Sequence, residues 1–512
     1  MLSKMYSCAV QGLSAIVLDV EVDISLGLPV FNVVGLPEAA VRESRERVRS
    51  AIQNAGYTFP MDRVVVNLAP ADIKKEGTGL DLPVALGILC ASGLFPQETA
   101  GRWLTAGELS LDGRLKPVKA ALPFALAARD AGFKGIILPR ENGPEAVLVK
   151  DIEVMAVAYL SEVVEFFSGR LEPSLFSSGD VPVEPETLDI NCPDFSQVRG
   201  QAHVKRALEI AAAGSHHVLL SGPPGSGKSM MAKRLPGILP PPSFEESMDI
   251  ARVYSITGMT TDGGYTLGTR PFRAPHHSIS DAGLVGGGPR PMPGEISLAH
   301  HGVLFLDEVP EFRRNVLEVL RQPLEEGRIC LARAGAKATY PCRFMLVAAM
   351  NPCPCGNLGN PARECDCTLA RIRQYRSKIS GPLMDRMDIQ VEVPQVDYED
   401  LASSGEEESS AAIRERVSEA RNIQAERFNG TRCITNADMS SDLVRKHCLL
   451  GSNAGSTLER AMKTLNLSAR AYTSILKVAR TIADLERDDK ISKSHILEAV
   501  NYKALDRPVD AM

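Results

Sequence analysis

Apolar and polar positions divide the chain into patterned blocks joined by polar stretches. Residues 1–168 alternate short apolar runs of strand type, such as "AIVLDVEVDI" and "RVVVNLAP", with longer runs of helical type. Residues 169–193 are rich in proline, serine and acidic residues, which is typical of a linker. From residue 194 to residue 396, strand and helix patterns alternate again. This alternation predicts a parallel α/β sheet.

The last block, residues 397–512, is helical in pattern. It opens with the acidic, serine-rich stretch "DYEDLASSGEEESS", which we interpret as a second connector. Its clearest amphipathic run is "LERAMKTLNLSARAYTSILKVARTIADLE". A chain of 512 residues is too long for one hydrophobic core, so about three domains are expected.

Composition places the chain among ordinary globular proteins, with 44% hydrophobic and 23% charged residues. Its most apolar stretch, "LPVALGILCASGLF", is too short for a membrane span and lies between Asp81 and Pro96. The first residues lack the features of a signal peptide, so a cytoplasmic protein without membrane contact is expected. The net charge of −6 gives no sign of nucleic-acid binding, so any basic surface must be local.

A nucleotide-binding motif lies in "HVLLSGPPGSGKSMMAKRL", which combines a strand, a glycine-rich turn and a helix. The turn satisfies G-x-x-x-x-G-K-S, a pattern whose backbone N–H groups surround the phosphates of ATP. We expect Lys228 to reach the β- and γ-phosphates and Ser229 to bind Mg²⁺. A chance glycine-rich turn would rarely have a strand before it and a helix after it. The predicted binding residues are Gly222, Pro223, Pro224, Gly225, Ser226, Gly227, Lys228 and Ser229.

Two further apolar runs end in polar side chains. "GVLFLDEVPEF" places Asp307 and Glu308 directly after a predicted strand, where Asp307 would hold Mg²⁺ through water and Glu308 would polarise the attacking water. "RFMLVAAMN" ends at Asn351, whose amide would position that water near the γ-phosphate. The simpler interpretation of Asn351 is a cap at the end of its strand.

Four of the eleven cysteines lie in "NPCPCGNLGNPARECDC", as two C-x-C pairs separated by nine residues. Four thiolates on two tight elbows can close tetrahedrally on a structural Zn²⁺, although two-residue spacers are commoner in zinc fingers. Free thiols in a loop are the alternative. The predicted ligands are Cys353, Cys355, Cys365 and Cys367. Basic residues follow them at Arg371, Arg373, Arg376 and Lys378.

The stretch "RICLARAGAKATYPCR" has four basic residues and no acidic one. It predicts two strands joined by a turn, with Arg333 and Lys337 near the tip, and a solvated hairpin is the simplest interpretation. Four histidines lie in two pairs between residues 244 and 301. We interpret them as packing residues of an inserted element and not as metal ligands: His276, His277, His300 and His301.

Several segments together resemble the magnesium-chelatase-like branch of the AAA+ ATPases: "DFSQVRGQ", the glycine-rich turn, "LFLDE", "AAMNPCPCG", "GPLMDRMDI" and "LSARAYTSILKVARTIADLE". With the N-terminal block included, the whole chain resembles the bacterial YifB/ComM family. The resemblance implies an α/β AAA+ core with a helical lid. It also implies that Arg386 is an arginine finger acting in a neighbour's active site and that Arg470 is the second sensor. From the residues alone, Arg386 could simply pair with Asp385 or Asp388.

The N-terminal block resembles the proteolytic domain of Lon in "KKEGTGLDLPVALGIL" and "AGELSLDGRLKPVKAALPFALAARDAGF". Lon-type proteases need a serine nucleophile and a lysine base, whereas Gly79 and Leu122 stand at these positions. A similar α+β fold occurs in ribosomal protein S5 and in the C-terminal domain of RadA. The resemblance therefore implies a scaffolding or DNA-binding domain without proteolytic activity.

The family resemblance implies a function that the residues alone do not give. Members resembling ComM act as homo-hexameric motors that use ATP and Mg²⁺ to move branched DNA junctions, and the basic hairpin resembles the pore hairpin of hexameric helicases. Expected partners are therefore single-stranded and branched DNA, together with recombination proteins. A metal-chelatase motor is the first alternative, although no metal-ion-dependent adhesion domain is recognisable here. An ATP-dependent chaperone or protease is the second.

Overall fold

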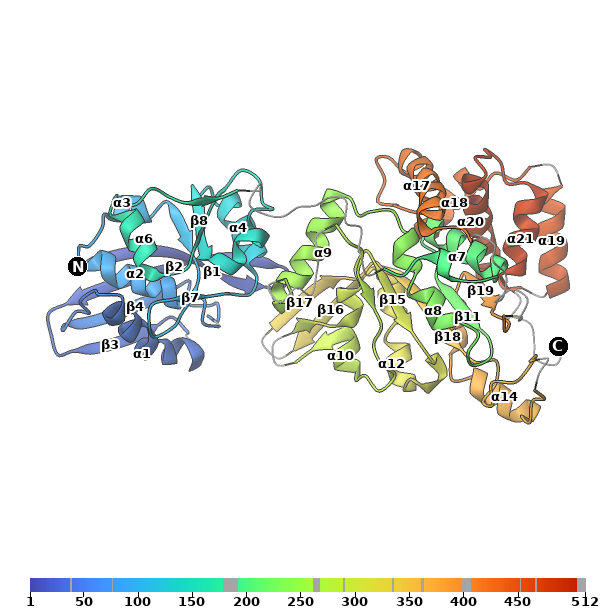
Figure 1. Ribbon diagram of the computed structural model, residues 1–512, viewed down its shortest axis with the longest axis horizontal. Helices are drawn as coiled ribbons and strands as arrows, with labels where there is room; N and C mark the ends of the chain where they lie inside the picture. Colours follow the sequence, from blue (N-terminus) through green and yellow to red (C-terminus); the bar gives the residue numbers. More distant parts are fainter. Residues whose placement is uncertain are drawn as a thin grey trace. The chain divides into compact units, whose positions relative to one another are not determined.

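The computed structural model describes most of the chain (Figure 1), and the fold outlined below concerns that part. The described residues are 1–36, 39–75, 77–177, 192–260, 268–288, 291–333, 336–360, 363–396, 407–451, 453–465 and 467–503. The predicted linker at 169–193 and the acidic connector after residue 396 lie mainly outside these ranges.

The chain forms two compact units. The first comprises Met1–Pro185, Ser247–Leu267 and Ala332–Thr339, and the second comprises Glu186–Glu246, Gly268–Leu331 and Tyr340–Met512. Two short stretches of the predicted α/β block therefore group with the N-terminal unit. In the described part of both units, no helix combines the length and the apolar character that a membrane crossing requires.

The N-terminal unit contains a mixed eight-stranded sheet in the order β10-β9-β8-β5-β1-β2-β4-β3. Strand β4 alternates buried and less buried residues, as expected where one face of a sheet packs on a core. The apolar stretch noted above contains helix α2 (Asp81–Ala91), all of whose residues are buried. The strands are β1 (Leu2–Gln11), β2 (Ser14–Ser25), β3 (Val30–Val34), β4 (Arg63–Ala69), β5 (Trp103–Thr105), β8 (Gly135–Pro139), β9 (Glu153–Val157) and β10 (Leu175–Phe176), with β6 (Glu108–Leu109) and β7 (Leu115–Lys116) as a separate pair. The helices are α1 (Ala39–Asn54), α2 (Asp81–Ala91), α3 (Gln97–Ala100), α4 (Ala121–Asp130), α5 (Gly143–Ala146) and α6 (Leu160–Phe167).

The second unit is built on a five-stranded parallel sheet in the order β12-β15-β18-β11-β19. Its strands are β11 (Val218–Ser221), β12 (Phe272–Arg273), β15 (Val303–Leu306), β18 (Met345–Met350) and β19 (Ile389–Glu392). Every residue of β11, β15 and β18 is buried, which explains their uninterrupted apolar sequences. Because the strands are parallel, the residues that follow β11, β15 and β18 all lie at one edge of the sheet.

Helices and two hairpins lie along this part of the sequence, although residues 247–267 and 332–339 belong to the first unit. The helices along the sheet segment are α7 (Ala202–Gly214), α8 (Lys228–Ala232), α9 (Phe244–Thr257), α10 (Asp281–Val285), α11 (Glu295–Leu298), α12 (Arg314–Glu318), α13 (Arg321–Glu326), α14 (Leu369–Arg376) and α15 (Gly381–Met384). The hairpins pair β13 (Gly286–Gly287) with β14 (Met292–Pro293) and β16 (Arg328–Arg333) with β17 (Ala336–Pro341). Both lie between the motif strands in sequence.

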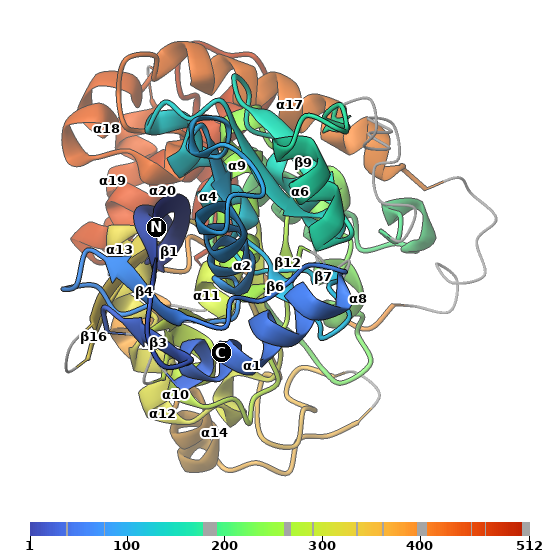
Figure 2. The same cartoon turned by 90° about the vertical axis from the view of Figure 1, so that its left-hand side faces the viewer.

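The C-terminal segment is helical and shares a core with the sheet. Helix α20 packs against α7, α17 and α21, and Figure 1 shows these helices grouped together. Figure 2 shows α17 and α20 in the upper half of its view. Its buried residues include Ile475, Val478 and Ile482, which recur every three or four positions as the amphipathic pattern requires. The helices are α17 (Ser410–Arg427), α18 (Ser441–His447), α19 (Ala454–Leu465), α20 (Ala469–Leu485) and α21 (Lys493–Asn501).

Candidate active site

The glycine-rich turn connects β11 to α8 at the carboxyl edge of the parallel sheet. Its first residue is fixed to the neighbouring strand, because the Gly222 N–H donates to the Met350 carbonyl over 3.2 Å. A β-carbon at Gly222 would lie 2.1 Å from the Val393 carbonyl oxygen, so no larger residue fits there. Gly227 has a φ of 91°, a left-handed conformation that favours glycine at the start of α8.

Two side chains of this turn present hydrogen-bond donors that could bind a phosphate. The Lys228 ammonium is largely buried and donates to the carbonyl oxygens of Gly222 over 2.6 Å and Pro223 over 2.8 Å. Burial lowers the pKa of Lys228, while the charges of the carboxylates after β15 act in the opposite direction. The Ser226 hydroxyl is buried and has no hydrogen-bond partner among the described residues, so it is left as a donor for a ligand. These features fit the phosphates of a nucleotide.

The residues after β15 supply the carboxylates. Asp307 accepts a hydrogen bond of 2.5 Å from the Ser229 hydroxyl, so a serine oxygen and a carboxylate oxygen lie side by side. Such hard oxygen donors suit Mg²⁺, which is commonly bound by few protein groups together with phosphate oxygens. Asn351, at the end of β18, accepts a hydrogen bond of 3.3 Å from the Lys228 ammonium. Lys228, Ser229, Asp307 and Asn351 therefore meet, although they come from three strand ends.

Glu308 extends this group toward solvent. Its backbone is left-handed, with φ 51° and ψ 46°, a strained conformation for a residue with a side chain and one that recurs at functional sites. The carboxylate is 59% exposed and lies 4.0 Å from His277. It lines a cavity of about 820 Å³ together with Asn351 and with three basic residues, Arg314, Arg371 and Lys378. No motif in the sequence predicted this basic lining beside Glu308.

The two arginines lie elsewhere. Arg386 and Arg470 both pair with the same carboxylate oxygen of Glu325, the latter over 3.1 Å, and neither lines the cavity at Glu308. Both line a cavity of about 670 Å³ between the sheet domain and the C-terminal helices. In the described part of the chain, Arg386 pairs with Glu325 and forms no ion pair with Asp385 or Asp388. Asp388 instead contacts His216 and accepts from the Ser474 hydroxyl. Nothing in the sequence singled out Glu325.

The Arg386 side chain is poorly neutralised by its surroundings. It is 7% exposed, and its Nε has no hydrogen-bond partner among the described residues. Burial and the nearby positive charges of Arg470 and Arg321 lower its pKa. A buried guanidinium that meets one half-exposed carboxylate, 52% exposed at Glu325, retains donors for a further anion.

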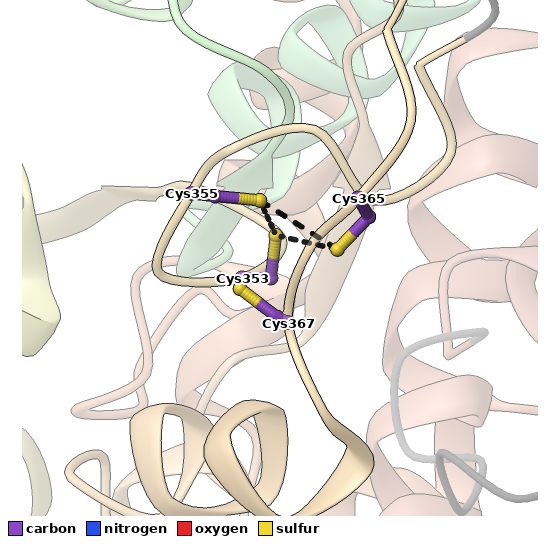
Figure 3. A group of neighbouring side chains, drawn as sticks. All are labelled: Cys353, Cys355, Cys365 and Cys367. Carbon is purple, nitrogen blue, oxygen red and sulfur yellow. Dashed lines mark hydrogen bonds between the residues drawn. The ribbon is translucent and has the colours of Figure 1, made fainter.

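The four clustered cysteines converge (Figure 3). The sulfur of Cys353 lies 3.4 Å from that of Cys355 and 3.6 Å from that of Cys365, and all four sulfurs lie within 4.8 Å of one another. Four thiolates around Zn²⁺ at about 2.3 Å would be separated by about 3.8 Å, so the spacing is close to that of a tetrahedral site. The Asn357 N–H lowers the pKa of the Cys355 thiol to about 6, whereas, against the effect of the Cys367 N–H, burial and the neighbouring thiols raise the pKa of Cys365 to about 12, and the pKa of Cys367 is raised as well. The fourth member of the cluster is Cys367.

The remaining predicted residues lie in three other places. Lys337 is exposed on β17, and Arg333 ends β16 with a side chain outside the described part of the structure. Leu122 is fully buried in the N-terminal unit, and the Gly79 carbonyl accepts from the Gly107 N–H, so these positions offer neither a base nor a nucleophile. His300 is buried and accepts from the Arg343 N–H, and burial lowers its pKa well below the usual value.

Comparison with known protein families gives matches along most of the chain. Residues 194–401 match the family described as magnesium chelatase, subunit ChlI, residues 20–142 match subunit ChlI of Mg-chelatase, and residues 407–503 match the C-terminal part of that subunit. The sequence is 43% identical over 507 residues to competence protein ComM of Haemophilus influenzae, covering 99% of this chain and 98% of that protein. It is 44% identical over 510 residues to YifB of Salmonella typhimurium, with the same coverage. The sequence is also 28% identical over 165 residues to Lon protease from Halothermothrix orenii. This shorter match covers 30% of this chain and 21% of that protein.

Replacing Lys228 by alanine or Glu308 by glutamine should abolish ATP hydrolysis, lowering kcat by at least about 100-fold. The two variants should differ in binding. Glu308→Gln keeps the phosphate and magnesium contacts and should still bind ATP, whereas Lys228→Ala should bind it poorly. Steady-state hydrolysis and equilibrium binding of a fluorescent ATP analogue measure both effects. Wild-type turnover by Glu308→Gln would show that another residue polarises the water.

Proposed function

Because this chain belongs to the YifB/ComM family of magnesium-chelatase-like AAA+ ATPases, we propose that it is an ATP-driven ring motor that moves branched DNA junctions during integration of incoming DNA. The observation that carries the ATPase part is the meeting of Lys228, Ser229, Asp307 and Asn351 at three parallel strand ends. The DNA part is supported by the near full-length similarity to a protein named for competence.

Each residue of the site has a distinct task in the proposed hydrolysis. Lys228 would exchange its two backbone carbonyl partners for phosphate oxygens. Ser229 and Asp307 would hold Mg²⁺, which neutralises phosphate charge when bound. Glu308 would accept the proton of the attacking water, and Asn351 would orient that water. The exposed carboxylate of Glu308 lies beside an open cavity, which suits a residue that must admit water.

The separate location of the arginines supports the proposed ring. Neither Arg386 nor Arg470 lines the cavity at Glu308, so we infer that both act on the nucleotide of a neighbouring subunit in a homo-hexamer. Glu325 would hold the two guanidinium groups in a lone subunit. A neighbour's phosphates carry more negative charge than one half-exposed carboxylate and would displace it. Charge on the transferring phosphoryl group would then be neutralised from across the interface.

The proposed DNA contact is the tip of the β16–β17 hairpin. Lys337 is exposed there, and Arg333 is its neighbour across the turn in sequence. Because the net charge is −6, phosphate binding must depend on such local basic elements. Single-stranded and branched DNA are the proposed ligands, and recombination proteins are the proposed partners. A chelatase motor is the competing function, because the family matches carry that name.

The clustered cysteines are proposed to hold one structural Zn²⁺. Their sulfur spacing supports this assignment. The metal would join two elbows of a loop that is rich in glycine and proline.

DNA should stimulate ATP hydrolysis, and branched DNA should be unwound or moved in an ATP-dependent reaction. In the double variant Arg333→Ala with Lys337→Ala, hydrolysis without DNA should persist while junction movement fails. The dependence of DNA affinity on salt should become shallower by a slope of about one to two, reflecting lost phosphate contacts. Lys463→Ala, on the exposed surface of α19, is the matched control. A wild-type ATPase rate indifferent to DNA would instead favour a chelatase motor or a chaperone.

Arg386→Ala should bind nucleotide nearly normally but lose turnover by at least about 100-fold, because charge on the transferring group is no longer neutralised. Mixing it with Lys228→Ala protein should restore part of the activity, since one class of mixed interface has both groups intact. Arg328→Ala, which removes an exposed arginine paired with Glu326, serves as the control. No recovery in mixed rings confirmed by mass spectrometry would contradict action across the interface.

Protein purified in reducing buffer without added metal should contain about one zinc ion per chain by elemental analysis, because four thiolates complete a closed tetrahedral site. Replacing Cys365 by serine should lower that content sharply, while Cys330→Ser, on the exposed β16, should leave it unchanged. Zinc-free protein whose four clustered thiols all react freely in the native state would contradict the assignment.

A further inference from the structure

The cysteine loop, residues 351–367, begins where β18 ends, and it is described apart from residues 361 and 362. β18 pairs with β11 in a register that places Met350 opposite Ser221, the last residue before the glycine-rich turn. The cysteine loop and the nucleotide-binding turn therefore leave adjacent strands at the same level of the sheet. Two loops that start side by side can support each other, and contacts between them show that they do.

The first contact is polar. Asn351 opens the cysteine loop, and its amide oxygen accepts from the Lys228 ammonium over 3.3 Å. Only one residue separates Asn351 from Cys353, which is fully buried. The position of the Asn351 amide therefore depends on where the Cys353 sulfur is held.

The second contact is steric. Gly356 is buried, follows Cys355 directly and has a φ of 81°. A β-carbon built on it would lie 2.6 Å from Cδ and 2.8 Å from Cγ of Pro224, inside the nucleotide-binding turn. The backbone of the cysteine loop thus lies directly against the Pro224 ring. A displacement of either loop by a few tenths of an ångström would be transmitted to the other, because close-packed contacts cannot stretch or compress freely.

The third contact runs through α14. Thr368 follows the last cysteine and caps this helix, accepting a hydrogen bond from the Arg371 N–H. Arg371 and Tyr375 of α14 line the cavity at Glu308. The Nε of Arg376 donates to the Pro352 carbonyl over 3.3 Å. This hydrogen bond connects α14 to the start of the cysteine loop. Both ends of the loop are therefore tied to residues around the nucleotide site.

The shape of the loop between these ties depends on its thiols. Two of its main-chain hydrogen bonds, Gly356 to Cys353 and Asn360 to Asn357, close local turns. Such turns do not bring the two C-x-C elbows together, whereas the sulfurs of Cys353 and Cys365 lie 3.6 Å apart across twelve residues of sequence. A metal ion bound to these sulfurs would fix this approach, since metal–thiolate bonds link the elbows directly.

We propose that the metal in the cysteine loop controls the nucleotide site, so that ATP affinity depends on metal occupancy. The ion holds the loop against Pro224 and sets the Asn351 amide beside Lys228. Without the ion, the support behind the glycine-rich turn loosens and phosphate binding weakens. Cys353, Cys355, Cys365 and Cys367 are thus positioning residues for ATP. This inference rests on the proposed zinc and ATPase functions and adds a regulatory link between them.

The loop offers a matched pair of substitutions. Gly356 and Gly359 both have left-handed backbones, with φ values of 81° and 77°, so an alanine strains both equally. A β-carbon at Gly359 meets nothing within 4 Å, whereas at Gly356 it would collide with Pro224. Gly356→Ala should weaken binding of a fluorescent ATP analogue by about tenfold or more while keeping its zinc, and Gly359→Ala should bind like the wild type. Equal ATP affinities in the two variants would overturn the proposed link between the cysteine loop and ATP binding.

Metal removal tests the same link in the unmodified, full-length protein. Zinc is released with a mercurial reagent, followed by excess thiol and a chelator, and its release is followed with a colorimetric indicator. Affinity for the ATP analogue should fall by about tenfold or more as zinc leaves and should return when Zn²⁺ alone is added back. Circular dichroism of the zinc-free protein controls for unfolding. Affinity that stays constant as zinc leaves, or purified protein without zinc, would overturn the inference.

The outcome separates this inference from the proposed motor function. If ATP affinity follows zinc but DNA fails to stimulate hydrolysis, the metal-controlled nucleotide site stands and the DNA motor falls. If DNA stimulates hydrolysis and ATP affinity ignores zinc, the motor stands and the metal link falls.

Discussion

The parallel pairing of β11 with β18 is the constraint on which the site depends. It aligns Ser221 with Met350, and the hydrogen bond from Gly222 to Met350 carries the alignment one residue beyond the strands. A shift of one residue would move Asn351 away from Lys228 and exchange the side chains that pack on the two faces of the sheet. β15, on the other side of β18, then brings Asp307 to the Ser229 hydroxyl. These strands are fully apolar because both faces of the sheet are covered.

A second constraint is that the two arginines lie apart from the group that contains Lys228 and Asp307. Lysine, serine and carboxylates form one group, whereas Arg386 and Arg470 meet at Glu325 in another. In the proposed ring, a second copy of the chain would complete the catalytic site by supplying these arginines. Hydrolysis would then depend on assembly, which is the physical basis for coupling ATP use to the movement of a ring. Glu325 limits the cost of leaving two guanidinium groups without a phosphate.

The cysteine loop connects the clustered thiols to the nucleotide site. It starts at Asn351, touches Pro224 through Gly356 and ends at the cap of α14. Three contacts to one site from a single loop make its conformation consequential for nucleotide binding. The glycine and proline residues of this loop allow tight turns but disfavour regular secondary structure. The proposed metal–thiolate bonds would therefore fix its conformation.

The sequence by itself determined the local elements of the site, because each depends on short-range chemistry. Three local features could be identified from the sequence alone: the G-x-x-x-x-G-K-S turn, Asp307 and Glu308 after an apolar strand, and the two C-x-C pairs. The near full-length similarity to ComM and YifB agrees with the family resemblance read from those motifs. Only the tertiary structure decided which groups meet across large separations in sequence. Glu325 lies far from both arginines along the chain, and Pro224 lies far from Gly356. Such contacts depend on strand register and helix packing, which local patterns do not encode, and for that reason they emerged only from the fold.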